Sequence, residues 1–218
     1  MIELRRVWFE REGRQILSDV SFEVDRGEFV YLTGTTGAGK TTALRLMLFE
    51  DRPTRGAVFV GEYDSETISE RDLPRLRRRV GAVLQDLKLL RDRTVFENVA
   101  FALEVTGTGR REAKRRSLTL LSSVELMHKR DDYPDSLSAG ERQCVAIARA
   151  LANDPFVLLA DEPTANMDPE STDRVFGVLA AANARGTAVV IGTHDTALVA
   201  RHPKRCLVLE GGRLQPAS

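Results

Sequence analysis

Residues 34–41 have the types and spacing of a loop that can hold phosphate. They read Gly-Thr-Thr-Gly-Ala-Gly-Lys-Thr and match the pattern G-x-x-x-x-G-K-[ST]. The glycines allow backbone angles at which successive N–H groups converge on phosphate oxygens. Lys40 would supply a cation for the β- and γ-phosphates, and the Thr41 hydroxyl would coordinate Mg²⁺. The pattern therefore predicts a site for ATP and Mg²⁺.

A chance glycine-rich turn would not need a strand before it and a helix after it. Both are predicted here, because an apolar run at residues 28–33 precedes the loop and helical spacing follows at residues 41–49. That helix would present its positive N-terminal end to the phosphates. We expect the nucleotide to contact Gly34, Thr35, Thr36, Gly37, Ala38, Gly39, Lys40, Thr41 and Thr42.

A pair of carboxylates follows the apolar run at residues 156–160. Two charges at a strand exit are common, but in a parallel sheet this edge lies beside the phosphate loop. Asp161 would then help to hold Mg²⁺ through water. Glu162 would polarise the attacking water as general base.

The segment at residues 137–143, Leu-Ser-Ala-Gly-Glu-Arg-Gln, begins another helix. Ser138 and Glu141 fit a capping box, which is sufficient to explain both residues. It does not explain Gly140, because glycine in a first helical turn lowers helix stability. A helix start rich in small residues can also bind an anion, so both interpretations stay open on these residues alone.

These residues must be positioned by an α/β architecture. Strand patterns at residues 2–8, 16–24, 28–33, 57–60, 80–84, 156–160, 188–193 and 205–209 alternate with helical ones, which predicts a largely parallel sheet. Residues 94–152 are helical throughout and indicate an inserted subdomain. A helix is expected at residues 170–184, and Gly211-Gly212 predicts a hairpin turn.

The composition of the chain bears on its partners and on the compartment in which it works. Lys+Arg and Asp+Glu are both 32, so the net charge is zero and no nucleic-acid partner is expected. Arginine-rich stretches at residues 75–79 and 110–116 are typical of solvated helix faces. Two cysteines without metal-ligand spacing fit a reducing compartment. No signal peptide or membrane-spanning run is predicted, so membrane association would require a partner.

Taken in order, the phosphate loop, Gln85, residues 137–143, Asp161-Glu162 and His194 resemble the ATP-binding cassette (ABC) family over essentially the whole chain. The resemblance implies a P-loop NTPase fold of ABC type with an N-terminal antiparallel β-subdomain. It implies one ATPase domain, in which residues 1–85 and 154–218 form the catalytic core and residues 86–153 the helical signature subdomain.

The same resemblance implies roles for five further residues. Ser138, Gly140 and Glu141 would bind the γ-phosphate of ATP held by a second copy, giving a head-to-tail dimer with two ATPs between subunits. Gln85 would sense Mg²⁺ and the attacking water. His194 would contact the γ-phosphate, although a lone histidine is more often structural.

The loop at residues 166–168 would cross the dimer interface and bring Asp168 to the nucleotide. Asp168 followed by Pro169 is also a good helix start. The sequence departs from the family pattern at Ala139, where glycine is usual, and at Met167, where leucine is usual. Phe9 is our choice for stacking on adenine, with Trp8 as the alternative, and either could instead be strand core.

Residues 85–90 and 94–105 most resemble the FtsE family of bacterial cell-division ATP-binding subunits. That resemblance implies a permease-like membrane partner of the FtsX type, regulation of cell-wall hydrolysis, and a peripheral position on the cytoplasmic face of the inner membrane.

The alternative is the ATPase subunit of a lipoprotein-release or macrolide-type exporter. DNA-repair and translation cassettes, which carry a coiled-coil insertion or tandem cassettes, fit less well, and Glu162 and His194 disfavour an adaptor that does not hydrolyse ATP.

Overall fold

The computed structural model describes residues 1–216 and contains two sheets. The smaller sheet has the order β2-β1-β4-β5 and is antiparallel. Its strands are β1 (Ile2–Arg11), β2 (Arg14–Val24), β4 (Arg55–Val60) and β5 (Tyr63–Asp64). This sheet is the predicted N-terminal antiparallel unit, extended by β5, which was not predicted.

The larger sheet has the order β10-β9-β3-β8-β7-β6. Its strands are β3 (Phe29–Thr33), β6 (Val80–Val83), β7 (Val157–Asp161), β8 (Ala188–Thr193), β9 (Arg205–Glu210) and β10 (Arg213–Leu214). Every pair is parallel except β9 with β10, where Glu210 opposite Arg213 forms the predicted hairpin. The mostly parallel sheet is therefore confirmed, and all parallel strands end at the edge that carries the phosphate loop.

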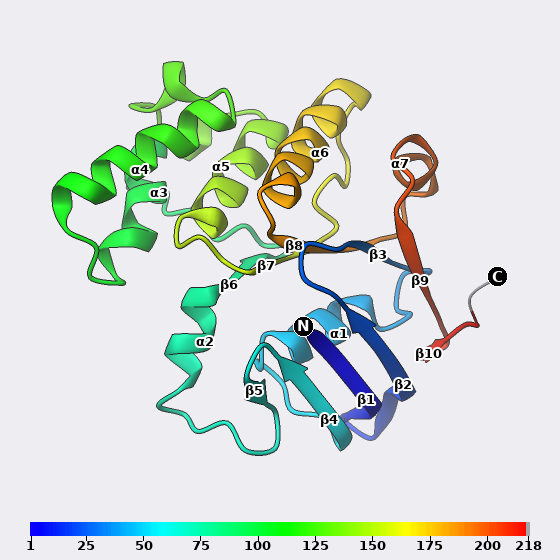
Figure 1. Cartoon of the computed structure of the whole chain (residues 1–218). Helices are drawn as coiled ribbons and strands as arrows, with labels where there is room; N and C mark the ends of the chain where they lie inside the picture. Colours follow the sequence, from blue (N-terminus) through cyan, green and yellow to red (C-terminus); the bar gives the residue numbers. More distant parts are fainter. Residues whose placement is uncertain (217–218) are drawn as a thin grey trace.

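Two apolar cores lie on opposite faces of the larger sheet. On one face, Val30 and Leu32 of β3 pack with the antiparallel sheet and α1 (Lys40–Met47). On the other face, Phe29 and Tyr31 pack with helices that include α6 (Pro169–Ala184). Figure 1 shows these layers, with α1 and the antiparallel sheet below β3 and β8, and α5 and α6 above them.

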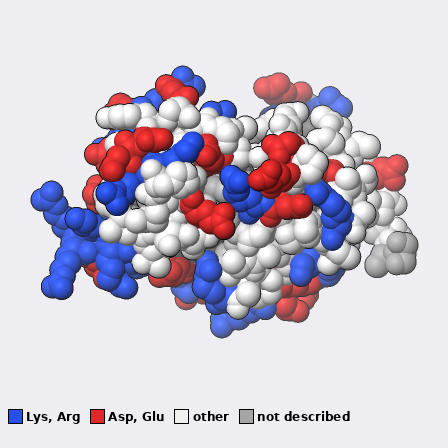
Figure 2. All heavy atoms as spheres, turned by 90° about the horizontal axis from the view of Figure 1, so that it is seen from above, with Lys and Arg blue, Asp and Glu red and all other residues white. Residues whose placement is uncertain are grey.

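The stretch between β6 and β7 contains α3 (Val95–Glu104), α4 (Arg110–Ser123) and α5 (Ala139–Leu151), with short 3₁₀ turns at Met127–Lys129 and Pro134–Ser136. These helices lie together at one side of the molecule (Figure 1). The predicted basic helix faces are confirmed in α4 and in α2 (Leu73–Arg79), whose arginines are mostly exposed. Figure 2 shows Lys and Arg gathered at the left edge, the side on which α4 lies in Figure 1.

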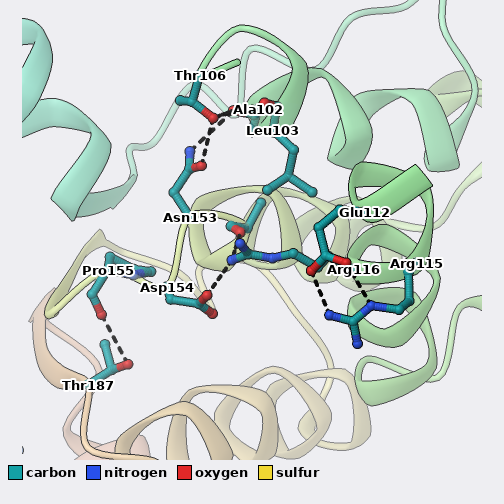
Figure 3. Close-up of polar contacts among 11 residues, drawn as sticks. Ala102, Leu103, Thr106, Glu112, Arg115, Arg116, Asn153, Asp154, Pro155 and Thr187 are labelled. Carbon is teal, nitrogen blue, oxygen red and sulfur yellow. Dashed lines mark hydrogen bonds and ion pairs between the residues drawn. The ribbon is translucent and has the colours of Figure 1, made fainter. Parts of the chain in front are cut away.

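A polar network joins α4 and the end of α3 to the turn between α5 and β7 (Figure 3). Arg116 donates to the Ala152 carbonyl at 2.6 Å and pairs with the Asp154 carboxylate. Asn153 accepts from the Thr106 hydroxyl at 3.0 Å and donates to the Ala102 carbonyl at 3.2 Å. These contacts fix the helical stretch against the start of a central strand.

Bulges in β1 reverse the alternation predicted for residues 2–8. Ile2 and Leu4 are buried, but the register shifts between Leu4 and Val7, where Arg6 has φ 48°. One extra residue transfers the following side chains to the opposite face. Val7 and Phe9 therefore face the core, and Trp8 is half-buried on the other face.

One more helix, α7 (Thr196–Arg201), follows β8 and was not predicted. Within residues 1–216, no helix combines the length and apolar character that a membrane span requires.

Candidate functional site

The phosphate loop connects β3 to α1 and depends on glycine at defined positions. Gly34 has φ 149°, and a Cβ there would lie 2.2 Å from the Leu209 carbonyl oxygen. Gly39 has φ 105° and precedes the first residue of α1. Any side chain would therefore disrupt the loop at Gly34 and strain it at Gly39.

Lys40 is only 6% exposed and turns back over this loop. Its ammonium donates to the carbonyls of Gly34 at 2.8 Å and Thr35 at 3.2 Å. These carbonyls are neutral, and a carboxylate oxygen of Glu162 lies 3.5 Å from the ammonium. The charge is therefore held inside the loop, where a phosphate oxygen could bind it.

Asp161 at the end of β7 meets the start of α1. Its Oδ2 accepts from the Thr41 hydroxyl at 2.7 Å, and the residue is 2% exposed. Burial raises the pKa of this carboxyl, and the hydrogen bond from Thr41 offsets that effect only in part. The other oxygen, Oδ1, is buried without a hydrogen-bond partner among residues 1–216. A buried carboxylate with a free oxygen beside a hydroxyl fits a hard cation.

The protein supplies few ligands for such a cation. Among the described residues, no cluster of three or more His, Cys, Asp and Glu side chains could hold a metal by itself. Mg²⁺ is commonly bound by one or two protein oxygens together with substrate phosphates and water. The donor set of Thr41 and Asp161 therefore fits Mg²⁺ that arrives with a nucleotide.

Glu162 lies between the phosphate loop and the end of β8. Its Oε1 is 2.7 Å from His194 Nδ1 and 3.5 Å from Lys40 Nζ, while Oε2 accepts from the Thr193 hydroxyl at 3.2 Å. The backbone at Glu162 has φ 48°, and its N–H donates to the Gly192 carbonyl at 2.7 Å. A left-handed conformation held by a neighbouring strand is typical of a residue that a functional site positions.

A cleft of about 880 Å³ gathers half of the predicted site residues. It is lined by Thr36, Gly37, Gly39, Lys40, Thr41, Thr42, Gln85, Glu162 and His194. Asp161 lies next to it, bonded to Thr41, which is 120 residues away along the chain. The P-loop, the end of β7 and the end of β8 therefore meet in one place.

Asp168 serves as the N-cap of α6, as its local sequence predicted. It accepts from the Ser171 N–H at 2.9 Å and from the Ser171 hydroxyl at 2.7 Å. The backbone hydrogen bond from Ser171 is the main cause of a lowered pKa for this carboxyl. Asp168 does not line the cleft, although residues 164–167 before it do.

The segment around Ser138 lies outside the cleft of its own chain. Ser138 and Glu141 form the predicted capping box at the start of α5. Burial disfavours ionisation of Glu141, but hydrogen bonds from Lys129 and from the Ser138 N–H outweigh burial and lower its pKa. Gly140 has a packing role that the sequence did not reveal, because a Cβ there would lie 3.0 Å from the Ser171 Cβ.

Phe9, which was expected to stack on adenine, lies in the core in this structure. Phe9 is 7% exposed and belongs to the core between the antiparallel sheet and α1. Neither Phe9 nor the alternative Trp8 lines the cleft. The bulge in β1 is the cause, since it turns Phe9 inward.

Sequence reasoning missed two groups of residues that shape the site. One is Thr193, which orients Glu162 and whose position before His194 was the available signal. The other is the wall of Arg14, Gln15 and Ile16 opposite the turn at Gly211-Gly212. No motif marks this wall, because it forms only when β2 packs beside β10.

Comparisons with known proteins agree with this geometry. Residues 17–165 match the family model described as ABC transporter. Cell division ATP-binding protein FtsE of Bacillus subtilis (strain 168) is 44% identical over 97% of this chain and 93% of its own length. The protein of the same name from Mycobacterium tuberculosis (strain ATCC 25618 / H37Rv) is 43% identical over 94% of this chain and 90% of its own length.

A solved structure of an ATP-binding cassette is also similar to this chain. The dimeric post-hydrolysis state of the ATP-binding cassette MJ0796, bound to ADP and Pi, has a TM-score of 0.88 and 32% identity to this chain. The likeness covers 99% of this chain and 97% of that one.

Proposed function

This chain belongs to the ABC transporter family of ATP-binding subunits, and we propose that it drives a bacterial cell-division complex through a permease-like membrane partner. It is an ATP-hydrolysing enzyme of the FtsE type. The observation that carries the site assignment is the meeting of Lys40, Thr41, Asp161, Glu162 and His194 at one cleft.

Glu162 acts as general base and accepts a proton from the water that attacks the γ-phosphate. His194, 2.7 Å from this carboxylate, orients it and contacts the γ-phosphate. Lys40 exchanges its loop carbonyls for β- and γ-phosphate oxygens and opposes the charge that develops there. Thr41, Gln85 and Asp161 would hold Mg²⁺ together with the phosphates, and the ion would supply further positive charge there. The products are ADP and phosphate.

A second copy of the chain completes the site in a head-to-tail dimer. Ser138, Gly140 and Glu141 lie outside their own cleft, and Ser138 is exposed, so this helix start could meet the nucleotide of another subunit. The N-terminal end of α5 would face the γ-phosphate, where partial positive charge is favourable. Asp168 and the loop before it would cross the same interface. The similar cassette MJ0796 is dimeric in its post-hydrolysis state with ADP and Pi, which supports this arrangement.

The partner is an integral membrane protein of the FtsX type, a proposal that rests on the FtsE relatives. Its cytoplasmic segment would dock in the groove of about 430 Å³ that Gln85 shares with Leu87, Leu89 and Pro134. The chain would divide into a core of residues 1–85 and 154–218 and a helical unit of residues 86–153. The helical unit would transmit the movement of dimer closure to the partner. The chain would lie on the cytoplasmic face of the inner membrane, and its ATP cycle would regulate cell-wall hydrolysis.

Substitution of Ser138 tests the dimer. Ser138→Arg places a bulky cation at the start of α5 and should abolish the ATP-dependent dimer measured by light scattering. Binding of ATP to the monomer should persist. Ser123→Arg, an exposed serine at the end of α4, is the matched control and should dimerise normally. Unchanged dimerisation of Ser138→Arg would contradict the shared site.

Co-purification tests the partner. Detergent extracts of cells that express the tagged chain should yield an FtsX-type permease, and depletion of the chain should give filamentous cells. Recovery of a lipoprotein-release or macrolide-type permease instead, with normal division on depletion, would contradict the cell-division role.

A further inference from the structure

The cleft extends beyond the phosphate loop to a wall that no proposed catalytic step uses. Arg14, Gln15 and Ile16 of β2 line this wall, and Gly211 and Gly212 of the β9–β10 turn face the same space. The catalytic side chains Gln85, Glu162 and His194 line other parts of the same cleft. With the triphosphate in the P-loop, the nucleoside of ATP needs a surface near that loop, and the wall supplies one.

No Phe, Tyr or Trp side chain of residues 1–216 lines the cleft. A base has two apolar π-faces, which bind well to a flat partner such as an aromatic ring or the planar guanidinium of arginine. Arg14 carries the one guanidinium among the described lining residues. It is therefore the flat group available to a base.

Arg14 is free to take this role. The residue is exposed, and its guanidinium has no ion pair or hydrogen bond within residues 1–216. The next residue differs, because the Gln15 amide donates to the carbonyls of Phe9, at 3.1 Å, and Leu17. Gln15 thus fixes the backbone of the wall, while Arg14 is available to a ligand.

The wall is also held rigidly against β10. The Ser18 N–H donates to the Gly212 carbonyl at 2.8 Å, and a Cβ on Gly212 would lie 2.3 Å from the Ile16 carbonyl oxygen. Glycine at this turn therefore permits the close approach that encloses the space beside Ile16. The fixed backbone of the wall loses little entropy when a ligand binds.

We propose that Arg14 stacks on the base of the bound nucleotide and replaces the aromatic side chain that the cleft lacks. Ile16 provides apolar contact beside it. This assignment rests on the proposed function, because it requires the triphosphate to bind in the P-loop.

Isothermal titration calorimetry with two probes tests the assignment. Mg-ATP contains the base, whereas inorganic tripolyphosphate presents the phosphates alone. Arg14→Ala should weaken Mg-ATP binding by about 5- to 100-fold, the range given by loss of one stacking partner. Tripolyphosphate affinity should change less than about twofold. Arg14→Tyr should recover most of the Mg-ATP affinity, because a ring also stacks on a base.

Arg77→Ala removes the same charge from an exposed position on α2 and is the control, with both affinities unchanged. Equal losses for both probes in Arg14→Ala would assign Arg14 to the phosphates and overturn the proposal. Unchanged Mg-ATP binding in Arg14→Ala would also overturn it. Failure of the wild-type chain to bind either probe would reject the proposed function, and the Arg14 assignment with it.

Discussion

Asp161 is a single residue that lowers the stability of the protein alone and would help to bind Mg²⁺ with a nucleotide. Its carboxyl is 2% exposed, one oxygen binds Thr41, and the other has no hydrogen-bond partner among residues 1–216. An unpaired buried polar atom of this kind destabilises a fold. Its retention beside the P-loop is explained if a cation with the nucleotide satisfies it. Glu162, by contrast, is fully engaged by His194, Thr193 and Lys40.

Asp161→Asn should remove the effect of Mg²⁺ on nucleotide binding. The amide keeps the size of the side chain but loses the charge that attracts the cation, so Mg²⁺ affinity should fall by about 10- to 100-fold. Titration calorimetry with ATP, with and without Mg²⁺, measures this. Asp92→Asn, at an exposed position, should behave like the wild-type chain. Equal Mg²⁺ dependence in Asp161→Asn and wild type would reject the metal assignment.

At the scale of elements, short contacts fix how the helices meet the sheet. Arg116 reaches from α4 to the α5–β7 turn, and Gly140 lets α5 approach the start of α6. Lys129 pairs with Glu141 at 2.9 Å and ties the preceding 3₁₀ turn to the same helix start. These contacts place the Ser138 segment where a second subunit could meet it.

Two neighbouring arginines of α4 should differ in their contribution to stability. Arg116 is 26% exposed in its side chain and binds a backbone carbonyl of another element, so Arg116→Ala should lower the free energy of unfolding by about 1–2 kcal/mol. Arg115 is 69% exposed and pairs within its own helix, so Arg115→Ala should cost about 0.5 kcal/mol or less. Urea denaturation of both variants measures the difference. Equal costs would show that the network in Figure 3 does not join the elements.

The contacts of Glu141 should make stability depend on pH. Its pKa is lowered from 4.5, so its carboxylate stabilises the fold above that pH, and the contribution is lost as pH falls through the folded-state pKa. Glu141→Gln keeps the cap but loses the charge, and should cost about 1 kcal/mol at neutral pH. The difference from wild type, measured by urea denaturation, should shrink below pH 4.5. A difference that is constant with pH would contradict this account.

The sequence predicted those elements whose local pattern is strong. The order of the long strands and helices, the hairpin at Gly211-Gly212, and the caps at Ser138 and Asp168 follow from periodicity and local hydrogen bonding. The two-residue β5 and the six-residue α7 were missed because they are too short for a periodic signal. Phe9 was misplaced because a bulge in β1 depends on pairing with β2, which adjacent residues do not encode.

The site residues also differ in whether a local sequence pattern marks them. Residues 34–41 and the Asp161-Glu162 pair carry motifs, so their convergence could be predicted. Arg14 joins the site through tertiary packing alone, and Thr193 carries no signal except its position before His194. Gly140 looked like a ligand-binding residue by composition, yet its contact with Ser171 gives it a packing role as well.

At the scale of the whole molecule, each chain of the proposed dimer would supply half of a site. The cleft is lined by P-loop residues, Glu162 and His194, and Asp161 lies beside it, while Ser138 and its neighbours lie outside it. A balanced net charge does not oppose association of two copies. ATP would therefore act as the link between subunits, and hydrolysis would release them and reset the membrane partner.

Light scattering combined with turnover of Glu162→Gln tests this account most directly. The variant should bind Mg-ATP and form a particle of twice the 24.2 kDa of one chain, while hydrolysis falls by at least about 100-fold. Glu170→Gln, an exposed carboxylate at the start of α6, should hydrolyse ATP like the wild type. Hydrolysis by Glu162→Gln at the wild-type rate would contradict the general-base role and the catalytic cleft built around it.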